Sequence, residues 1–427
     1  MSGLKFEFNW EAGEGVKTPE LRQTMARLSI LVNGAVVTRV HDGVAMTVRD
    51  AIHFPLYALA EWVLTHWYPL LHESESAGRR GMDERHLLCR GGEGFALPRL
   101  SLISEGEWIR LSWQEYAVPY SNLRFLDSGE ARLPRKEVAE TLLNLIRATV
   151  LRLKENHGEH ATLLEEEWES FTALTGEERM FCEVAGALGL DPFSTDEAQD
   201  ERIVDATRQL PDALQEEFFA SASWEHLEQD LAWVRDSLDL INNPEISVVL
   251  SPFRERVQHG LKNRTTDAPW QVGYSCAREV RQELGVLNRP LESEDLDKLG
   301  WRISQSIPRP SHVFDAVATM TDEFYLGRFA VSGRYPHSRR FAFARAFFEC
   351  LTAQRFPRLV TRGATYTQKE SRAFAAELLA PADTLRERIT GDTVSLDEIA
   401  DLAEDFSVSS MVIEHQITNH KIATVSY

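Results

Sequence analysis

The chain has 427 residues, 43% of them hydrophobic, which is enough for a large core and favours two or three domains over one. Lysine and arginine number 46 against 66 for aspartate and glutamate, and the formal charge of −20 argues against nucleic acid as a partner over most of the surface. The four cysteines are widely spaced and no apolar stretch reaches the length of a membrane span, so we expect a cytoplasmic protein with reduced thiols and no membrane association.

Residues 1–132 contain several short runs in which apolar and polar side chains alternate, a pattern typical of β-strands. One strongly apolar stretch at 54–71 interrupts them and has helical spacing. This mixture predicts an N-terminal α+β module. The glycine-rich run at 91–94 lacks the lysine and hydroxyl residue of a phosphate-binding loop, and we interpret it as a turn.

Residues 133–267 have a different pattern, in which apolar side chains recur every three or four positions. Thr175-Gly-Glu-Glu is a capping-box sequence that predicts the start of one of these helices. We therefore predict a mainly helical region over 133–267 and a third domain over 268–427, with boundaries near turn-forming prolines.

The C-terminal segment predicts a helix that Gly285 ends, a strand pair near 313–320 and 328–332, and a helix over 339–354. A second helix follows and contains Phe374-Ala-Ala-Glu-Leu-Leu-Ala-Pro. The capping sequence that begins at Ser395 then predicts a pair of short helices joined by a turn.

This order of elements resembles the ImmA/IrrE family of zinc metallopeptidases. Members of that family carry an Arg-Phe-x-x-Ala-His-Glu-x-x-His helix and then a Glu-Ala-x-x-Phe-Ala-Ala-x-Leu-Leu-x-Pro helix. Arg340-Phe-Ala-Phe-Ala344 matches the first pattern up to its catalytic part, and the run from Phe374 to Pro381 matches the second. The resemblance covers about the last third of the chain and implies a zincin-like α+β domain with a helix-turn-helix-like tail.

Every catalytic position of the first pattern is changed in this chain. Arg345 and Glu349 stand at the two histidine positions and Ala346 at the general-base position, whereas Glu370 matches the distant carboxylate ligand. A guanidinium is always charged and repels a dication, so we expect neither metal nor another cofactor. We also predict that Arg345 forms a salt-bridged cluster with Glu349 and Glu370 where the metal would lie.

The resemblance implies a function in binding rather than cleavage. A protein or peptide partner would occupy the former active-site groove, with His337, Arg340, Glu377 and His415 as candidate contacts. ImmA/IrrE proteases remove repressors, so an inactive relative would be a regulatory factor in bacterial stress, mobile-element or phage-defence control.

Two alternatives remain open. In the first, Glu349, Glu370 and a histidine from outside the helix hold zinc, and the chain is an active metallopeptidase that cleaves a regulator protein. In the second, the N-terminal half is a sensor or scaffold that carries the recognition. The sequence has no signal for an oligomeric state.

Overall fold

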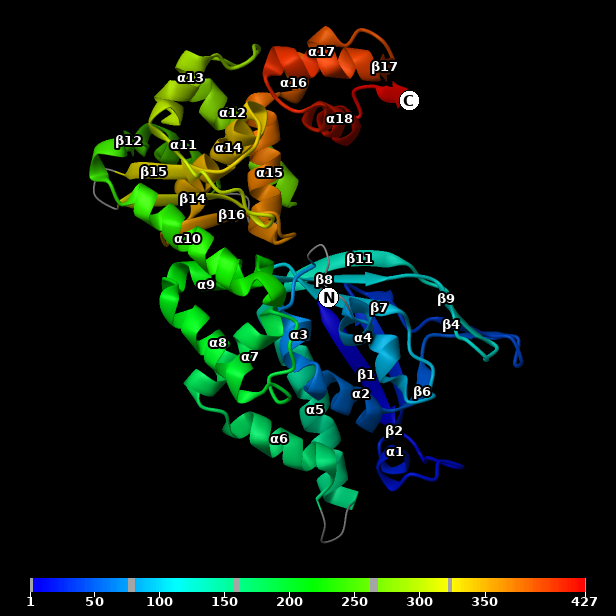
Figure 1. Cartoon of the computed structure of the whole chain (residues 1–427). Coiled ribbons are helices and arrows are strands. Elements are labelled where there is room, and N and C mark those ends of the chain that lie inside the picture. Colours follow the sequence, from blue (N-terminus) through cyan, green and yellow to red (C-terminus); the bar gives the residue numbers. More distant parts are fainter. Residues whose placement is uncertain (1–2, 76–80, 157–160, 262–267, 322–324, 427) are drawn as a thin grey trace. The chain divides into compact units, whose positions relative to one another are not determined.

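The computed structural model describes residues 3–75, 81–156, 161–261, 268–321 and 325–426 (Figure 1). Helices and several small sheets make the protein an α+β protein, as predicted. The described chain forms two compact units, Met1–Val204 and Asp205–Tyr427. The three-part division at 132 and 267 stays a prediction. No helix in the described ranges combines the length and the apolar character that crossing a bilayer requires.

The described residues of the N-terminal unit form three antiparallel sheets. In the first, β2 pairs with three strands, and the members are β1 (Leu4–Trp10), β2 (Met25–Val32), β3 (Ala35–Val36) and β6 (Ile52–Pro55). The second has the order β5 (Thr47–Arg49), β4 (Val40–Asp42), β10 (Leu123–Phe125) and β9 (Tyr116–Ala117). The third has the order β11 (Gly129–Pro134), β8 (Trp108–Trp113) and β7 (Leu100–Ser104).

Helices cover these sheets and bury their apolar faces. The apolar stretch predicted as one helix is two, because the helix breaks at His66, and these are α2 (Leu56–Thr65) and α3 (Trp67–His72). The remaining helices of this unit are α1 (Pro19–Gln23), α4 (Met82–His86), η1 (Leu88–Gly92), α5 (Arg135–Asn156), α6 (Leu163–Ala173) and α7 (Gly176–Ala187). The predicted capping box at Thr175 begins α7. Helix α8 (Glu197–Gln209) contains the boundary between the two units.

The C-terminal unit is built on a five-stranded sheet. Its central strands β14 (Phe314–Thr321) and β15 (Leu326–Val331) are the predicted antiparallel pair, and β16 (Arg358–Thr361) pairs with the other side of β14. Two short strands, β12 (Val248–Val249) and β13 (Gln305–Ser306), pair with β15. The tail adds a small parallel pair, β17 (Thr393–Ser395) and β18 (Thr424–Ser426).

Thirteen helical segments of the described chain complete this unit. They are α9 (Asp212–Ser221), η2 (Trp224–His226), α10 (Leu227–Ile241), η3 (Pro244–Ile246), α11 (Ser251–Leu261), α12 (Pro269–Leu284), α13 (Ser293–Lys298), η4 (Trp301–Ile303), α14 (Pro336–Thr352), α15 (Tyr366–Leu379), α16 (Ala382–Arg388), α17 (Leu396–Phe406) and α18 (Ser410–Asn419). Gly285 ends α12 with a φ of 72°, as its predicted role as a cap requires. Ser395 begins α17 with the predicted capping box.

Helices α12 and α15 approach each other very closely at one glycine. A Cβ added to Gly273 on α12 would lie 2.7 Å from the backbone nitrogen of Phe374 and closer still to the carbonyl oxygen of Glu370. Only glycine allows the two backbones to approach this closely. The contact fixes the position of α15, which carries Gln368, Glu370 and Ser371 of the polar side chains described below.

Candidate functional site

Helix α14 is buried over most of its length and carries charged side chains into the interior. Pro336 occupies its first turn, where the missing N–H costs nothing. Ten consecutive residues, Ala342 to Leu351, are buried, and a helix that is apolar on all sides is normally an interior helix. Arg345 is only 2% exposed and Glu349 is fully buried, so both need partners inside the protein.

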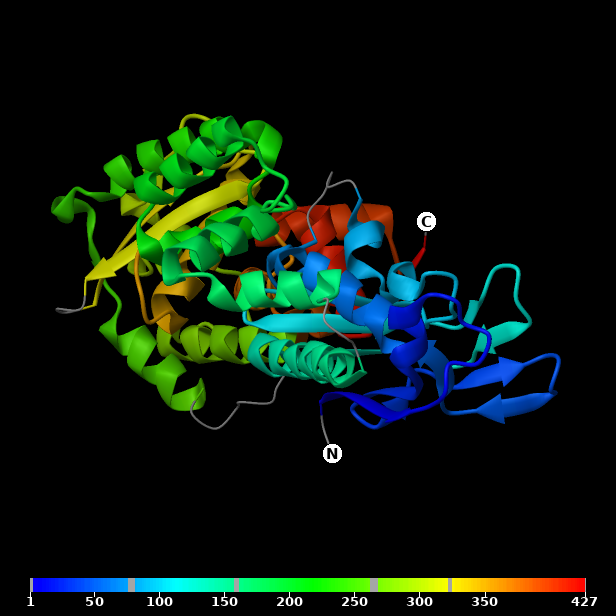
Figure 2. The ribbon, with the colours of Figure 1, turned by 90° about the horizontal axis from the view of Figure 1, so that it is seen from below.

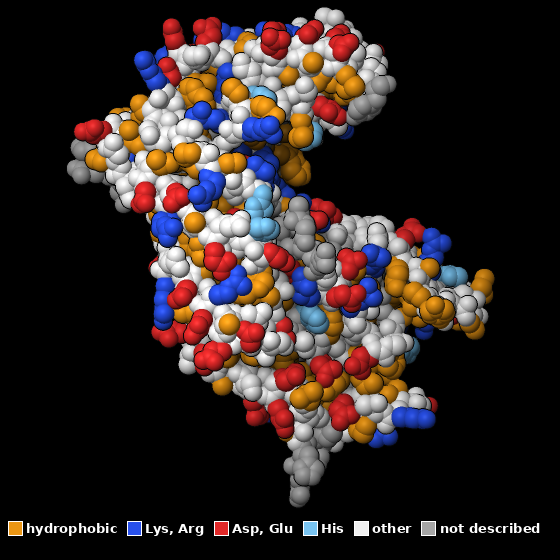
Figure 3. All heavy atoms as spheres, viewed as in Figure 1, with side chains coloured by type: hydrophobic (Ala, Val, Ile, Leu, Met, Phe, Trp, Pro, Cys, Tyr) orange, Lys and Arg blue, Asp and Glu red, His pale blue; other side chains and the backbone are white. Residues whose placement is uncertain are grey.

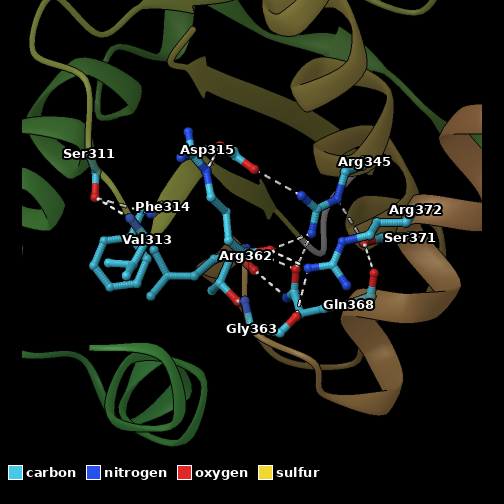
Figure 4. Close-up of polar contacts among 12 residues, drawn as sticks. Ser311, Val313, Phe314, Asp315, Arg345, Arg362, Gly363, Gln368, Ser371 and Arg372 are labelled. Carbon is cyan, nitrogen blue, oxygen red and sulfur yellow. Dashed lines mark hydrogen bonds and ion pairs between the residues drawn. The ribbon is translucent and has the colours of Figure 1, made fainter. Parts of the chain in front are cut away.

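The guanidinium of Arg345 has a hydrogen-bond acceptor for each of its nitrogens (Figure 4). Nη1 donates to Oδ2 of Asp315 at 2.9 Å, and Nε donates to Oγ of Ser371 at 3.2 Å. Nη2 donates to the carbonyl of Thr361 and to Oε1 of Gln368, each at 2.6 Å. These bonds join α14 to β14, β16 and α15 and compensate a buried charge.

Asp315 connects the buried arginine to the surface. Its second oxygen, Oδ1, accepts a hydrogen bond from Nε of the exposed Arg362 at 3.0 Å. Burial lowers the pKa of Arg345, and the charge of Asp315 opposes that shift. Asp315 is the carboxylate that forms an ion pair with the arginine, and the charges of Glu349 and Glu217 act in the same direction from further away.

Glu349 and Glu370 lie close enough to repel each other. Arg358 donates from Nε to Oε2 of Glu349 at 3.2 Å, and Oε1 of that carboxylate has no hydrogen-bond partner among the described residues. Burial raises the pKa of Glu349, and Arg358 opposes the shift. Burial, followed by the charge of Glu349, raises the pKa of Glu370 to about 8. At neutral pH, Glu370 is therefore mostly protonated.

A third buried carboxylate comes from α9. Glu217 accepts a hydrogen bond at 2.9 Å from Nε2 of Gln368 and lies 3.6 Å from Nη2 of Arg358. Burial raises its pKa to about 7. Glu217 and Glu349 thus share one arginine, and only one of the two carboxylates is balanced by its charge.

Gln368 occupies the free edge of strand β16. Its Oε1 accepts from the backbone N–H of Thr361 at 2.8 Å, and its Nε2 donates to the carbonyl of Leu359 at 3.0 Å. These are the two bonds that a neighbouring strand would make at this edge. Thr365, the cap of α15, accepts from the backbone N–H of Gln368 and fixes this residue in the first turn of the helix. One side chain thus satisfies two backbone groups of this edge.

The predicted salt bridges of Arg345 with Glu349 and Glu370 are wrong. The arginine pairs with Asp315 and Glu349 pairs with Arg358, while Glu370 forms no ion pair among the described residues. Helical spacing places Arg345 and Glu349 on one face of α14, but the arginine side chain extends toward β14 and β16, where a carboxylate and two oxygen acceptors lie in reach. The structure does bring all three residues into one region, since the charge of Glu349 acts on both of the others.

The remaining candidate residues lie elsewhere in this unit. The ring of His337 stacks on that of Tyr335, with 5.5 Å between centroids. Arg340 donates from Nη2 to the carbonyl of Leu291 at 2.8 Å, and burial lowers its pKa. His415 is exposed on α18. None of these three residues is among the hydrogen-bond partners of Arg345 given above.

Glu377 is almost fully buried and lies next to a cavity between α12 and α18. Its Oε1 accepts from Nε of Arg278 at 3.0 Å, and its Oε2 accepts from Nε2 of Gln416 at 3.0 Å. Arg278 lines a cavity of about 740 Å³ together with His420, whose Nε2 is 3.7 Å from Oε2 of Glu377. The other lining residues are Trp270, Gln271, Tyr274, Ser275, Glu279 and Asn419.

Sequence reasoning did not identify Asp315, Glu217 or Gln368 as members of the polar cluster. Asp315 is 30 residues before Arg345 and alternates with apolar strand residues, as an exposed strand residue would. Glu217 lies on a helix that the sequence assigned to the preceding region. The spacing of Thr365 and Gln368 matches a capping box, which would have predicted the start of α15 but not the bonds to β16.

Among the described residues, no three or more histidine, cysteine, aspartate or glutamate side chains are placed to hold a metal ion together. A scan of the sequence against protein-family models finds no match, and a search of curated proteins finds none either.

Proposed function

We propose that residues 268–427 are a degenerate ImmA/IrrE-like metallopeptidase domain and that the protein acts in the cytoplasm by binding a regulatory protein or peptide without cleaving it. The observation that carries the proposal is the set of four hydrogen bonds around Arg345, the residue at the first histidine position. A side chain with these bonds is a structural part of the domain. The proposed setting is bacterial stress, mobile-element or phage-defence control.

The side chains at the matched positions do not fit a zinc ion. Zinc sites use neutral imidazole, thiolate and carboxylate ligands, whereas Arg345 places a fixed positive charge there. Glu349 is held by Arg358, and Ala346 has no group that could take a proton from a bound water. We therefore derive no hydrolytic step at this position.

The cavity beside Glu377 is the binding surface that the proposal uses. Gln368 already bonds two backbone groups at the edge of β16, so an extended peptide could not pair with these two groups without displacing it. The cavity instead presents Trp270, Tyr274 and Arg278, which belong to the residue types that contribute most to protein interfaces. Glu377 holds the Nε of Arg278 and so orients this guanidinium at the cavity.

Metal analysis of the purified full-length chain tests the loss of the metal site. We expect far less than one zinc per wild-type chain after dialysis against zinc. Stoichiometric zinc, together with peptidase activity that a chelator removes, would overturn the proposal in favour of the active-enzyme alternative.

A variant with restored ligands tests the kinship with metallopeptidases separately. The triple substitution Arg345→His, Ala346→Glu and Glu349→His recreates the metal-binding pattern and should gain about one zinc per chain, with Glu370 as the third protein ligand. Adding Glu370→Ala to that variant should weaken zinc binding at least about tenfold. A restored variant that is folded by circular dichroism and does not bind zinc would contradict the kinship.

Partner binding is tested through the cavity. Trp270→Ala and Tyr274→Ala in the full chain should abolish cross-linking between the protein and its partner in cells, with Leu151→Ser as a control for an exposed apolar residue elsewhere. If both variants cross-link as well as wild type, the partner does not bind at this cavity. That result would favour the alternative in which the N-terminal half carries the recognition.

A further inference from the structure

Strand β1 is an edge strand, and its hydrogen bonds show which of its residues face outward. In the described chain β1 pairs only with β2. At one end of this pairing the N–H of Asn33 donates to the carbonyl of Gly3 at 2.9 Å. At the other end the N–H of Glu11 donates to the carbonyl of Met25, also at 2.9 Å. Bonded and non-bonded pairs alternate along an antiparallel ladder, so the odd-numbered residues of β1 are the ones that bond to β2.

The backbone groups of the even-numbered residues therefore point away from β2. At the start of the strand, the carbonyl of Leu4 accepts a long hydrogen bond from Oγ1 of Thr141 at 3.4 Å. The N–H and C=O groups of Phe6 and Phe8 bond to no residue that the structure describes. The strand is seven residues long, contains no proline and pairs with β2 without a bulge, three features that leave an edge open to a further strand.

A groove follows this edge between β1 and helix α5. Its volume is about 380 Å³, and helix α5 lies beside β1 in both ribbon views (Figure 1, Figure 2). The lining residues are Leu4, Lys5, Phe6, Glu7 and Phe8 of the strand and Thr141, Asn144 and Leu145 of the helix. Successive residues of a strand point to opposite faces, so a groove that touches five in a row runs along the edge and not over one face.

Three aromatic side chains on the inner face of β1 are only partly covered. Phe6, Phe8 and Trp10 point to the same side, because residues two apart on a strand share a face. The rings of Phe8 and Trp10 meet edge to face, with 5.1 Å between centroids. Their neighbours Leu28 and Ile30 on β2 are fully buried, since β2 has strands on both sides. A strand beyond β1 would cover the aromatic side chains in the same way.

We propose that an extended segment of another protein adds to β1 as a further strand, with apolar side chains at alternate positions toward α5 and basic side chains among the others. Only an extended backbone offers donors and acceptors at the spacing of a strand edge. Pairing with Phe6 and Phe8 would provide the affinity, and the groove beside Asn144 and Leu145 would select the side chains.

Charge disfavours a second copy of this chain as the occupant. The formal charge of each copy is −20, and acidic side chains are spread over the face that Figure 3 shows. Two such molecules repel each other, whereas a segment with basic side chains is attracted. Lys5 and Glu7, the charged residues of β1 at the groove, have opposite signs and favour neither. The net charge of the chain therefore selects a basic segment over an acidic one.

Selection of random peptides tests the proposal. The peptides are displayed on phage, have about 12 residues so that they exceed a typical strand, and are selected on the immobilised full-length protein. We expect the enriched sequences to have apolar residues at alternate positions and a net positive charge. The most enriched peptide, labelled with fluorescein, should bind the full-length protein with a Kd below about 100 μM in fluorescence anisotropy.

Methylation of the peptide backbone distinguishes strand addition from other modes of binding. An added strand bonds to β1 through every second residue only. N-methylation of one alternate set of residues should therefore weaken binding at least about tenfold, and N-methylation of the other set should leave it nearly unchanged.

Variants of the protein test the place of binding. Asn144→Arg puts a long side chain into the groove and should weaken binding at least about tenfold. Phe8→Pro removes the outward N–H and should weaken binding more than Phe8→Ala, which keeps this N–H and loses only the ring. The control Leu163→Ser, at a position 57% exposed on α6, should bind like wild type. Circular dichroism checks that each variant is folded.

Four outcomes overturn the proposal. The first is a selection that yields no alternating apolar pattern, and the second is equal effects of the two methylated sets. The third is binding that Asn144→Arg and Phe8→Pro both leave unchanged. The fourth is a wild-type dimer in sedimentation that Phe8→Pro dissociates, which assigns the edge to a second copy. The zinc and cross-linking measurements concern the C-terminal unit, so failure here is distinct from failure of the proposed function.

Discussion

Arg345 and Asp315 form an ion pair, with Nη1 2.9 Å from Oδ2, in which the arginine is 2% exposed and the aspartate 21% exposed. The pair joins the buried helix α14 to the central strand β14. Because Asp315 also accepts from the exposed Arg362, the buried charge connects to the surface through one carboxylate. Substitutions on the two sides of this carboxylate should therefore have different effects.

Arg345→Ala should lower the free energy of unfolding by about 3 kcal/mol, because it removes four hydrogen bonds at once from groups that water does not reach. The matched control is Arg362→Ala, which removes the exposed partner of Asp315 and should cost less than about 1 kcal/mol. Urea denaturation measures both. If both variants lost the same free energy of unfolding, burial would not explain how much Arg345 contributes to stability.

Glu370 should make the protein less stable at alkaline pH. Its pKa is raised from 4.5 to about 8 in the folded state. The unfolded chain therefore releases this proton first, and the stabilisation that is present below about pH 4.5 is lost as the pH rises to about 8. Glu370→Gln should remove this loss and gain more than about 1 kcal/mol over wild type at pH 8, with no gain at pH 4.

The measurement for Glu370 is thermal or urea unfolding of wild type and variant at both pH values. Glu387→Gln is the control, because Glu387 is exposed on the same unit. Parallel curves for wild type and Glu370→Gln would contradict the raised pKa.

Gln368→Glu should destabilise the protein more than Gln368→Ala. Alanine leaves the N–H of Thr361 and the carbonyl of Leu359 unpaired, at a cost of about 2 to 3 kcal/mol. Glutamate keeps the acceptor but loses the donor to Glu217 and places a second carboxyl group next to it. The larger cost should shrink at acidic pH, where both carboxyls are protonated, and stability measured at pH 5 and pH 8 checks this order.

Gly273→Ala should cost about 1 to 3 kcal/mol, because its Cβ would meet the backbone of α15 at Glu370 and Phe374. Gly176→Ala is the control, since a Cβ there meets nothing within 4 Å and the backbone conformation suits any residue. A stable Gly273→Ala protein would mean that α12 and α15 can separate without loss.

The sequence predicted the elements of the C-terminal unit better than their contacts. Apolar periodicity and capping residues placed the strand pair, the helix that carries Arg345 and the tail that begins at Ser395, since each of these signals is local. The partner of Arg345 depends on how the sheet and two helices meet, which no short window contains. Glu217 is further away still, 151 residues before its partner Gln368.

In the N-terminal unit, the spacing of apolar residues predicted the α+β character but not the surface. The prediction that the apolar stretch at 54–71 is a helical core segment is confirmed, although the helix breaks at His66. The sequence did not single out Val44, Met46 and Tyr120, which are exposed although hydrophobic residues are more often buried. They are exposed because two hairpins extend beyond the packed body of the unit. The direction of a hairpin depends on how the sheets pack, which a short stretch of sequence does not show.

Met46 and Tyr120 also add a conformational cost to two exposed turns of the N-terminal unit, because both residues have positive φ angles. Glycine at either position would relieve the left-handed backbone by about 1 kcal/mol, yet the chain keeps a large side chain there. The free energy of unfolding of a typical protein is on the order of 10 kcal/mol, so conformational strain at two adjacent turns lowers it by a measurable fraction.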